Sequence, residues 1–578
     1  MEVSLKFLIL LFPAVVFAVA LDPVIVSSKS GLKKSQMSIS PDVITEEEIQ
    51  NNISTELIDI LRSETALNIT QTGGPGSSYN ISIRGAESRH TLVLIDGVRA
   101  NDPSDIGGSF NMPALSTLDI EKIEILKGPQ SLLYGSDAIG GVINIITKKG
   151  EQGGKVSYSQ GATEELAASL TVFGATNVFY INTFYNESDP ISSFKDGDER
   201  DLSINRGLTL NYAKAFSLLD IEWQYKAIKS YNEFDDSLAD STDNYAKNLN
   251  QNFYQKITIN NFKHSISHQN TDRYSKFSNT SNSNYQGTRT LNELNYNAFS
   301  TLFGITHEYL TYEQSGIDEL KVNQYAAFIN HADSFDDYFY SAGVRSDYHE
   351  EFKNYSTYGL GFGKNLGDRK QIKLNYSTGF KSPTLYQLYT FEPGTFPTFG
   401  NENLKPETSN TLELTILKSN PVSGWSISFY DTRIDEFIIY DNNTYINESS
   451  LRTYGVDVGL NQQLNHFSFN ESISLNRSID SSKKYSLRKP QAKANLGINY
   501  KLNDKNSLNI DSTWVSSQYD FNNELVKAYD ITNLVHQFRI KDIVLKNGIR
   551  NVFDREYEEL KGYGTLGLNI YTKLEYNY

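Results

Sequence analysis

The side chains best suited to chemistry in this sequence are carboxylates grouped in two polar segments. The first segment holds Asp196, Asp198 and Asp201, and the second holds Asp235, Asp236, Asp240 and Asp243. Carboxylates at alternating positions suit a hard cation such as Ca²⁺, which takes about six to eight oxygen ligands. The spacing does not form an EF-hand loop, and acidic residues are also common in hydrated loops, so both interpretations stand.

Two further patterns resemble functional motifs but lie in unsuitable local structure. Gly562–Gly567 reads GYGTLG, the G-x-G-x-x-G pattern of dinucleotide sites, but an alternating strand follows where that pattern must open a helix. His264 and His268 have a metal-ligand spacing only on a helix, and their neighbourhood alternates as a strand. Since no nucleophile elbow, Walker loop or Cys/His cluster occurs, the sequence does not support an enzyme or a catalytic cofactor.

The composition indicates what kind of fold carries these residues. The 578 residues are 39% hydrophobic with a mean hydropathy of −0.44, yet they include 37 Tyr and 31 Phe. A chain that is aromatic-rich but hydrophilic on average is typical of a membrane β-barrel. The net charge of −16 argues against a nucleic-acid partner, because phosphate-backbone binding depends on clustered Lys and Arg.

The N-terminus predicts export. Lys6 precedes an apolar run, Phe7–Ala18, and Ala18-Val19-Ala20 has the small-x-small pattern of a cleavage site. Residues 1–20 are therefore predicted to be a signal peptide. The alternative, a membrane anchor, would need a run long enough to span roughly 30 Å of hydrocarbon. Because no comparable apolar run follows, the mature chain can cross a membrane only with strands.

The pattern of the chain changes near residue 150. From 40 to 150, short capped helices are predicted at Glu46–Asn51 and Leu57–Leu61. Strand-like apolar runs lie at Thr91–Ile95 and Val142–Ile146. This first part is predicted to be a small α+β domain.

From 151 to 578, apolar and polar residues alternate, most clearly from Leu566 to Tyr578. Such strands have one apolar and one polar face. A soluble sandwich also alternates, but an open sheet of this extent would leave aggregation-prone edges. Closure into a transmembrane barrel removes the edges, and the length fits between about 16 and 22 strands.

Five segments stand in order along the chain. They are ISIRGAESRHTLVLIDGV (Ile81–Val98), YGSDAIGGVINIIT (Tyr134–Thr147), FKSPTLYQLY (Phe380–Tyr389), GNENLKPETSNTLEL (Gly400–Leu414) and RNVFDREY (Arg550–Tyr557). Together they resemble the motifs of TonB-dependent outer-membrane receptors, from about residue 22 to the end. The resemblance implies a 22-stranded antiparallel transmembrane β-barrel at 151–578, occluded by an N-terminal α+β plug domain at 40–150.

The resemblance also implies energy coupling from the inner membrane, through TonB acting with ExbB and ExbD. The matching TonB box comprises Asp22, Pro23, Val24, Ile25, Val26 and Ser27. An extended, β-branched run after a proline can add as a strand to the sheet edge of a partner. The polar residues up to 39 would then be a flexible tether, whereas the alternative is an ordinary disordered leader.

In this family the apices of two plug loops face outward and touch the ligand. The matching residues are Ser77, Ser78, Tyr79, Asn101, Asp102, Ser104 and Asp105, and the alternative is that each is a solvated turn residue. Arg84 lies in the IRG element, and an unpaired guanidinium inside a barrel would be costly. Glu407 and Glu413 are therefore predicted to pair with Arg84 and hold the plug to the barrel.

The transported nutrient is predicted from the similarity of this sequence to particular receptors within the family. GYGTLG after RNVFDREYEEL, the compact plug end and the small size are most similar to the cobalamin (vitamin B12) receptors of the family, which carry calcium-binding aspartates in early extracellular loops. Cobalamin is therefore the predicted ligand, with Ca²⁺ ordering the two acidic loops and cations at the mouth bridging to lipopolysaccharide of the outer membrane. A ferric siderophore receptor is the alternative, since it shares all these motifs. A passive porin, of another class, would have no use for a plug or a TonB box.

Overall fold

The computed structural model describes residues 29, 41–51, 56–108, 110, 115–149, 153–235, 244–277, 282–392, 397–420 and 422–578. The predicted signal peptide and TonB box (Asp22–Ser27) lie outside the described residues, as do Asp236, Asp240 and Asp243. In the described part of the chain, no helix combines the length and the apolar character that a membrane span requires.

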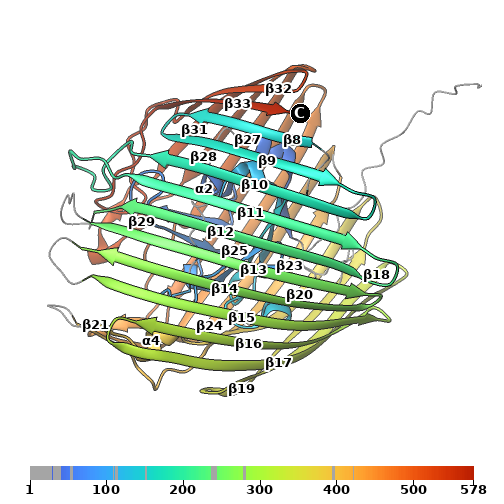
Figure 1. The fold of residues 1–578 in the computed structure, drawn as a ribbon, viewed down its shortest axis with the longest axis vertical. Helices are drawn as coiled ribbons and strands as arrows, with labels where there is room; N and C mark the ends of the chain where they lie inside the picture. Colours follow the sequence, from blue (N-terminus) through green and yellow to red (C-terminus); the bar gives the residue numbers. More distant parts are fainter. Residues whose placement is uncertain are drawn as a thin grey trace, which may run out of the picture.

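Twenty-two antiparallel strands close into a barrel, as the sequence predicts (Figure 1). The strands are β8 (Gly153–Gln160), β9 (Thr163–Phe173), β10 (Asn177–Ser188), β11 (Ser203–Ala215), β12 (Asp220–Glu233), β13 (Tyr245–Ile259), β14 (Phe262–Lys276), β15 (Ser283–Ala298), β16 (Thr301–Gln314), β17 (Ile317–Phe335), β18 (Tyr338–His349), β19 (Lys353–Asn365), β20 (Lys370–Lys381), β23 (Glu407–Lys418), β24 (Ser423–Asp441), β25 (Thr444–Leu464), β26 (Phe467–Asp480), β27 (Ala492–Asn503), β28 (Asn506–Val515), β31 (Tyr529–Ile540), β32 (Ile543–Arg550) and β33 (Asn569–Asn577). β33 pairs with β8, for example Tyr576 with Val156, and this pairing closes the barrel.

Burial along the strands is the reverse of that in a soluble protein. On β33, Leu574 is 48% exposed, whereas its neighbours Lys573 and Glu575 are 4% and 5% exposed. On this strand the apolar side chain therefore points out of the barrel and the charged side chains point into it. A water-soluble sandwich would bury the apolar face, so this pattern excludes it and fits a wall that faces lipid.

The two ends of the barrel differ in their connections. One end, here called the short-turn end, has tight turns such as residues 260–261 and 336–337. The other, the long-loop end, lies on the left in Figure 1 and carries connections such as 189–202, 382–406 and 551–568. Short elements in these loops are α4 (Leu385–Tyr389), β21 (Phe391–Glu392), β22 (Thr398–Phe399), β29 (Gln518–Tyr519), the 3₁₀ turn Phe521–Asn523 and β30 (Leu525–Val526).

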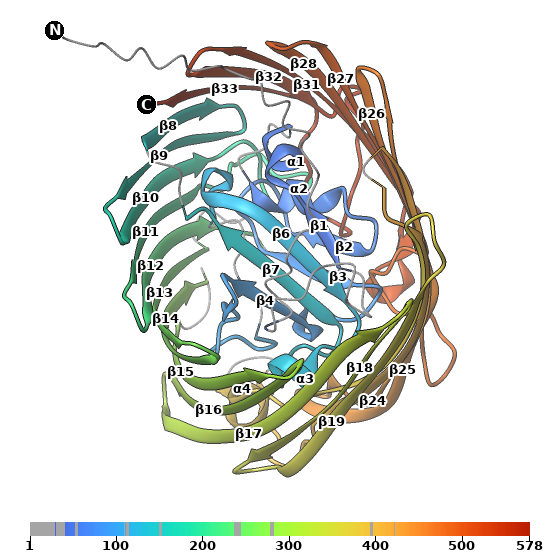
Figure 2. The same ribbon diagram turned by 90° about the vertical axis from the view of Figure 1, so that its right-hand side faces the viewer.

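A small domain fills the barrel lumen (Figure 2). Its five-stranded sheet has the order β1 (Asp42–Ile44), β6 (Ile120–Lys127), β7 (Gly141–Thr147), β4 (Thr91–Ile95) and β5 (Val98–Arg99). The remaining elements are α1 (Glu46–Asn51), α2 (Leu57–Arg62), the hairpin β2 (Leu67–Gln71) and β3 (Tyr79–Ile83), α3 (Ser131–Tyr134), and 3₁₀ turns at Ser88–His90 and Thr117–Asp119. Leu57, Ile83 and Ile143 lie in its own apolar core, which makes this plug a separately packed unit.

The predicted elements differ from the observed ones mainly at their ends. Helix α1 and strand β4 have the predicted bounds, and β7 is longer than predicted by one residue at each end. The final strand begins at Asn569 instead of Leu566, because the backbone N–H of Leu568 donates to Asp554 Oδ1 at 2.7 Å and holds this segment in the preceding loop. The domain boundaries at residues 40 and 150 stay predictions.

Candidate ligand-binding site

The loop between β2 and β3, residues 72–78, is called the first plug loop. It turns at Gly73 and Gly76, where φ is +127° and +85°, values that side-chain-bearing residues rarely adopt. A Cβ atom on Gly73 would lie 2.5 Å from Ser193 Oγ, and Ser188 Oγ donates to the Pro75 carbonyl at 3.0 Å. The first plug loop therefore packs directly against the barrel loop 189–202 at the long-loop end.

Three residues in or next to the first plug loop were predicted to bind ligand. Ser77 is buried, and its hydroxyl donates to the Gly74 carbonyl at 2.8 Å. Tyr79 is partly buried, and its hydroxyl donates to the Phe110 carbonyl at 2.9 Å. Ser78 is exposed. Of the three, Ser78 is the side chain most open to an incoming molecule.

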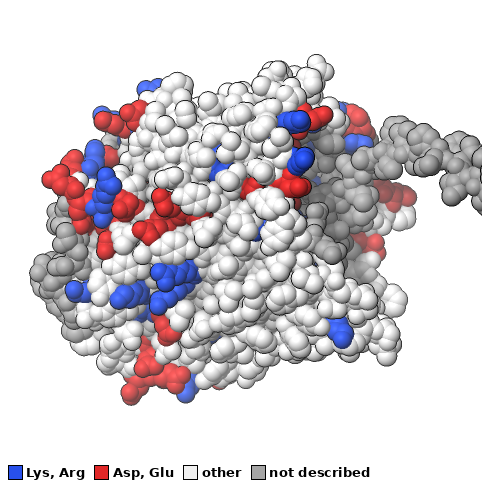
Figure 3. All heavy atoms as spheres, turned by 45° about the horizontal axis from the view of Figure 1, so that its top comes forward, with Lys and Arg blue, Asp and Glu red and all other residues white. Residues whose placement is uncertain are grey.

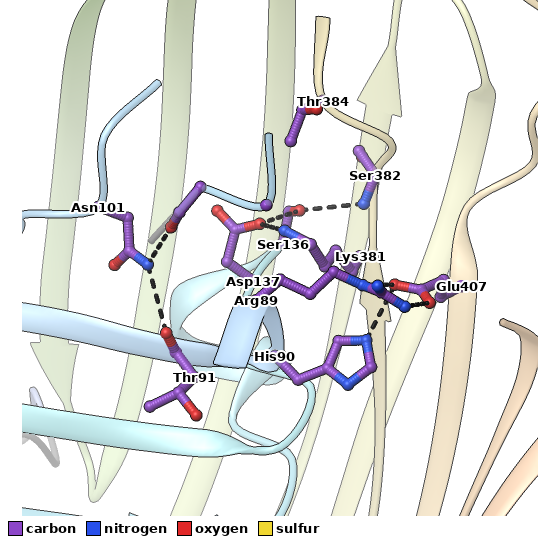
Figure 4. Close-up of polar contacts among 12 residues, drawn as sticks. Arg89, His90, Thr91, Asn101, Ser136, Asp137, Lys381, Ser382, Thr384 and Glu407 are labelled. Carbon is purple, nitrogen blue, oxygen red and sulfur yellow. Dashed lines mark hydrogen bonds and ion pairs between the residues drawn. The ribbon is translucent and has the colours of Figure 1, made fainter. Parts of the chain in front are cut away.

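The second plug loop, residues 101–108, is shaped by its own side chains. Asn101 Oδ1 accepts from the Val93 N–H at 2.8 Å, and its Nδ2 donates to the Thr91 carbonyl at 3.2 Å (Figure 4). Asp102 Oδ1 accepts from both the backbone N–H and the hydroxyl of Ser104, each at 2.7 Å. Of the four predicted ligand residues in this loop, Asn101, Asp102 and Ser104 are buried and fix the loop's conformation.

The barrel holds the second plug loop through two arginines that the sequence did not single out. Arg273 on β14 donates to Asp105 Oδ1 at 2.8 Å and to the Ser104 carbonyl at 3.0 Å. Arg289 on β15 donates to the Asn101 carbonyl at 2.8 Å. On the other side, the Thr384 hydroxyl donates to the Ile106 carbonyl at 2.9 Å. Asp105 is thus committed to a barrel contact, whereas the Ile106 side chain is 45% exposed.

The long loop 382–406 is supported by an apolar cluster beside the second plug loop. Leu385, Tyr386 and Leu388 of α4 pack with residues of the neighbouring strands, including Tyr285 and Tyr445. Thr384 and Gln387 form a capping box that starts α4. The packed and capped α4 therefore supports Thr384, which contacts Ile106.

Three carboxylates converge on the loop that touches the first plug loop. Ligand atoms of Glu199, Asp201 and Asp235 all lie within 4.8 Å of one another. Asp235 Oδ2 accepts from the Ser192 hydroxyl at 2.8 Å, and Asp201 Oδ2 accepts from the Ser193 N–H at 2.5 Å. The structure thus brings together Asp201 and Asp235 from the two predicted acidic segments and adds Glu199.

Asp196 and Asp198 are exposed and are not in this cluster. The sequence prediction named only aspartates and so missed Glu199, although Glu199 and Asp201 have the same two-residue spacing as Asp196 and Asp198. Oxygen-only ligands of this kind fit a hard divalent cation.

Arg84 anchors the plug to the barrel wall. Its Nη2 donates to Glu413 Oε1 and its Nε donates to Asp457 Oδ2, both at 2.8 Å. The guanidinium also lies 4.1 Å from the centre of the Tyr430 ring. Burial opposes the charged guanidinium, but the carboxylates of Glu413 and Asp457 outweigh it and raise the pKa of Arg84. Asp457 was not foreseen from the sequence.

Glu407 does not pair with Arg84, contrary to the prediction. It lies six residues before Glu413 on β23, and in an extended strand this separation is roughly 20 Å, too far for one guanidinium to reach both. Glu407 instead accepts from Arg89 Nη2 at 2.7 Å and contacts His90 Nε2 at 3.0 Å (Figure 4). Burial lowers the pKa of His90, although Glu407 opposes that effect. His90 Nδ1 accepts from the Glu87 N–H at 3.3 Å, so Nε2 is the nitrogen that donates to Glu407.

A third anchor joins the end of the plug to β20. Lys381 Nζ donates to Asp137 Oδ1 at 2.7 Å, and the Ser382 N–H donates to the Ser136 hydroxyl at 3.1 Å (Figure 4). The plug is therefore fastened at several separate points around the lumen.

Comparison with known families agrees with this architecture. Residues 33–142 match the family described as TonB-dependent Receptor Plug Domain. Residues 147–573 match the family described as TonB dependent receptor-like, beta-barrel. The chain belongs to the TonB-dependent receptor family. It is therefore a TonB-dependent transport protein of the outer membrane, in a family of transporters and receptors.

Individual relatives of this receptor differ in ligand. The vitamin B12 transporter BtuB of Vibrio cholerae serotype O1 is 26% identical, over 96% of this chain and 95% of the relative. Among solved structures, the siderophore receptor PirA from Acinetobacter baumannii has a TM-score of 0.79 at 17% identity, covering 93% of this chain and 98% of that one. A mutant ferric enterobactin receptor, PfeA from Pseudomonas aeruginosa in complex with enterobactin, has a TM-score of 0.78 at 17% identity, covering 94% and 100%. The solved structures show the shared fold.

The orientation of the receptor follows from its connections. Barrels of the bacterial outer membrane have short periplasmic turns and longer extracellular loops. The long-loop end of this receptor therefore faces outside, and both plug loops face the exterior with it. The short-turn end faces the periplasm.

On the periplasmic side, a cavity of about 1640 Å³ separates the plug from part of the wall. Its lining is rich in hydroxyl and amide side chains, for example Ser472, Asn495 and Asn509 on β26, β27 and β28. Ser474, two residues beyond Ser472, does not line the cavity and is 1% exposed, with its hydroxyl bonded to Asp457 at 2.7 Å. The inner wall thus changes from lining a cavity to packing tightly against its neighbours over two residues.

This change gives a testable difference in reactivity. In the cysteine-free chain, Ser472→Cys is expected to react with a water-soluble maleimide roughly tenfold or more faster than Ser474→Cys, because the second site reacts only after local opening. Labelling rates measured by mass spectrometry check this. Equal rates would show that no water-filled space separates the plug from β26.

Proposed function

We propose that this receptor imports cobalamin across the outer membrane. The observation that carries the proposal is the match to the vitamin B12 transporter of Vibrio cholerae, which extends over 96% of this chain and includes both domains. The siderophore receptors resemble the chain at 17% identity, which supports the fold and does not select a ligand. Cobalamin is therefore preferred, and a ferric siderophore is the competing ligand.

The arrangement of the mouth is consistent with a large ligand that carries amide groups. Arg273 pairs with Asp105 and Arg289 pairs with Glu308, each at 2.8 Å. These two cations are therefore already neutralised by the protein and do not call for an anionic ligand. Exposed Ser78 and Ile106, at the two plug loops, offer a hydroxyl and an apolar contact. We expect the bound ligand to rest on both loops, with the buried residues Ser77, Asn101, Asp102 and Ser104 keeping the loops in shape.

Equilibrium binding to the detergent-purified receptor tests the choice of ligand. We expect cyanocobalamin to bind with saturation, and the members of a ferric siderophore panel to bind far more weakly. The matched comparison is competition between unlabelled cyanocobalamin and each siderophore on the same protein. Tight siderophore binding without cyanocobalamin binding would overturn the proposed ligand but leave the transport class intact.

We further propose that Ca²⁺ occupies the cluster of Glu199, Asp201 and Asp235. Three carboxylates within 4.8 Å repel one another unless a cation lies between them. The cluster lies in the loop whose Ser193 packs against Gly73, so a bound ion would order the wall beside the first plug loop. Calcium binding and ligand binding should therefore be coupled.

Asp235→Asn is expected to abolish this coupling. Chelating Ca²⁺ should lower the affinity of the unaltered receptor for cyanocobalamin by roughly tenfold, within the usual 1–3 kcal/mol range of coupling free energies. The variant should bind with the low affinity whether or not Ca²⁺ is present. Asp196→Asn, at an exposed carboxylate in the same loop, is the control and should keep the full calcium response. A calcium response in Asp235→Asn equal to that of the control would contradict the assignment.

A further inference from the structure

The outer wall carries four cations that the transport site does not use. Arg206 on β11, Lys229 on β12, Lys247 on β13 and Lys276 on β14 form what we call the cation patch. They lie near the long-loop end and point outward, since the residues alternating with them, such as Thr209, face the plug. Figure 3 shows Lys and Arg side chains gathered on the outer wall toward the long-loop end, on the left.

The arrangement of the cation patch is unfavourable for the protein alone. Arg206 and Lys229 are directly opposed partners on adjacent strands. Like charges in this position destabilise a sheet. Among the residues that the structure describes, no member of the patch forms an ion pair. Of the carboxylates on the same face, Glu187 accepts a hydrogen bond from the Tyr185 hydroxyl and Glu233 accepts one from Tyr231. Asp272 on β14 accepts one from Asn270 Nδ2 at 3.4 Å.

A second pair of opposed cations shows how the chain neutralises such a contact. Arg433 and Arg452 are direct partners on β24 and β25, also on the outer face. Arg433 pairs with Asp435 at 2.8 Å, and Arg452 pairs with Asp431 at 2.6 Å. The barrel wall therefore neutralises Arg433 and Arg452 with its own carboxylates. It does not do so at the cation patch, where an anion from outside the protein could bind.

Tyrosine rings complete the patch. Tyr231, Tyr245 and Tyr274 form a row with ring centres 5.5 and 5.9 Å apart. Lys247 and Lys276 lie 4.7 and 5.6 Å from the centre of the Tyr245 ring. Ammonium and guanidinium groups bind phosphate, and aromatic faces give an apolar platform for a ring such as a sugar. The combination suits a phosphorylated sugar.

The position of the cation patch on the membrane-facing wall indicates which molecule carries that sugar. Closer to the short-turn end, the same outer faces carry the apolar row Leu210, Tyr225 and Phe253. A lipid whose phosphorylated headgroup meets the patch would place its acyl chains along this row. We propose that the cation patch binds the phosphorylated disaccharide headgroup of lipopolysaccharide in the outer leaflet. This rests on the outer-membrane family of the receptor and is independent of the transported nutrient.

The test compares two double variants, each of which removes two outward-facing cations that are directly opposed on adjacent strands. Each cation near an anionic membrane surface contributes about a fivefold factor in binding, so Arg206→Gln/Lys229→Gln is expected to weaken binding of purified lipid A by roughly 25-fold. Arg433→Gln/Arg452→Gln, the matched control, should change it less than about twofold, because those cations already have partners. Dissociation constants and retained lipid are measured by native mass spectrometry of the detergent-purified receptor.

Other ligands decide between a glycolipid site and simple charge attraction. Dephosphorylated lipid A should bind weakly, and phosphatidylglycerol and inorganic phosphate should compete poorly. Equal binding of phosphatidylglycerol, competition by inorganic phosphate at similar concentrations, or equal affinities of the two double variants would overturn the proposal. If Arg206→Gln/Lys229→Gln fails to fold, Lys247→Gln/Lys276→Gln tests the other half of the patch with the same readout.

Discussion

Arg84→Met is expected to loosen the plug in the barrel, with a destabilisation of about 3–5 kcal/mol. Removing one partner of a buried ion pair has a cost of this order, because the remaining charges are left unpaired in a region of low dielectric. Here two carboxylates, Glu413 and Asp457, would lose a guanidinium that is 4% exposed and bonded to both at 2.8 Å. Thermal unfolding should show the loss, and planar bilayers should show more frequent large-conductance openings.

Two controls separate this effect from a general loss of charge. Arg433→Met removes an arginine that is 59% exposed and paired with Asp435 on the outer wall, where an ion pair contributes only about 0–1 kcal/mol. Arg84→Lys keeps the charge but loses the planar fork that reaches two carboxylates, so it should fall between the unaltered receptor and Arg84→Met. If Arg84→Met behaved like Arg433→Met, the anchor would not hold the plug.

Deleting Asp22–Ser27 is expected to reduce uptake to the level of cells without the receptor while leaving ligand binding unchanged. The proposed reason is that TonB pulls on these residues after they add as a strand to its sheet. Lys29, just beyond the box, donates to Glu293 on β15 at 2.7 Å, so the chain next to the box is attached inside the lumen. Pulling on the box would therefore act on the interior of the barrel.

Matched measurements distinguish coupling from binding. Cyanocobalamin uptake by cells is compared with equilibrium binding to the same purified variant. Deleting six residues of the predicted tether, 30–35, is the length control and should preserve most of the uptake. Val24→Pro should resemble the box deletion, since proline cannot donate a backbone hydrogen bond to a partner strand. Normal uptake after deletion of the box would show that energy coupling uses another segment.

Much of the fold was predictable because periodicity is a local property. A lipid-facing strand must alternate, and Leu574 between Lys573 and Glu575 shows the pattern in three residues. The plug helix Glu46–Asn51 and the strand Thr91–Ile95 likewise follow from local apolar spacing and polar helix starts. The strand count was less constrained, because length and composition fit several closed barrels.

The site was predictable only in part. The identity of the plug loops came from resemblance, and their glycine-rich and aspartate-rich sequences marked them as turns. Their side chains could not be assigned to ligand contact or loop support from the sequence. Asn101 and Ser78 are both polar loop residues, yet Asn101 is 1% exposed and bonded to Val93, whereas Ser78 is open to solvent.

The sequence by itself determined which faces of the strands meet lipid and which meet the plug, since alternation assigns every residue of a strand to one face. Only the tertiary structure decided which inward charges meet. Glu413 and Asp457 reach Arg84 from β23 and β25, strands that are both paired with β24, and the registers of these pairings set their separation. Glu407 points into the barrel, as Glu413 does, but it lies six residues earlier on β23. It is therefore too far from Arg84 and pairs with Arg89 instead. Register and closure depend on contacts between distant parts of the chain, and no local pattern encodes those distances.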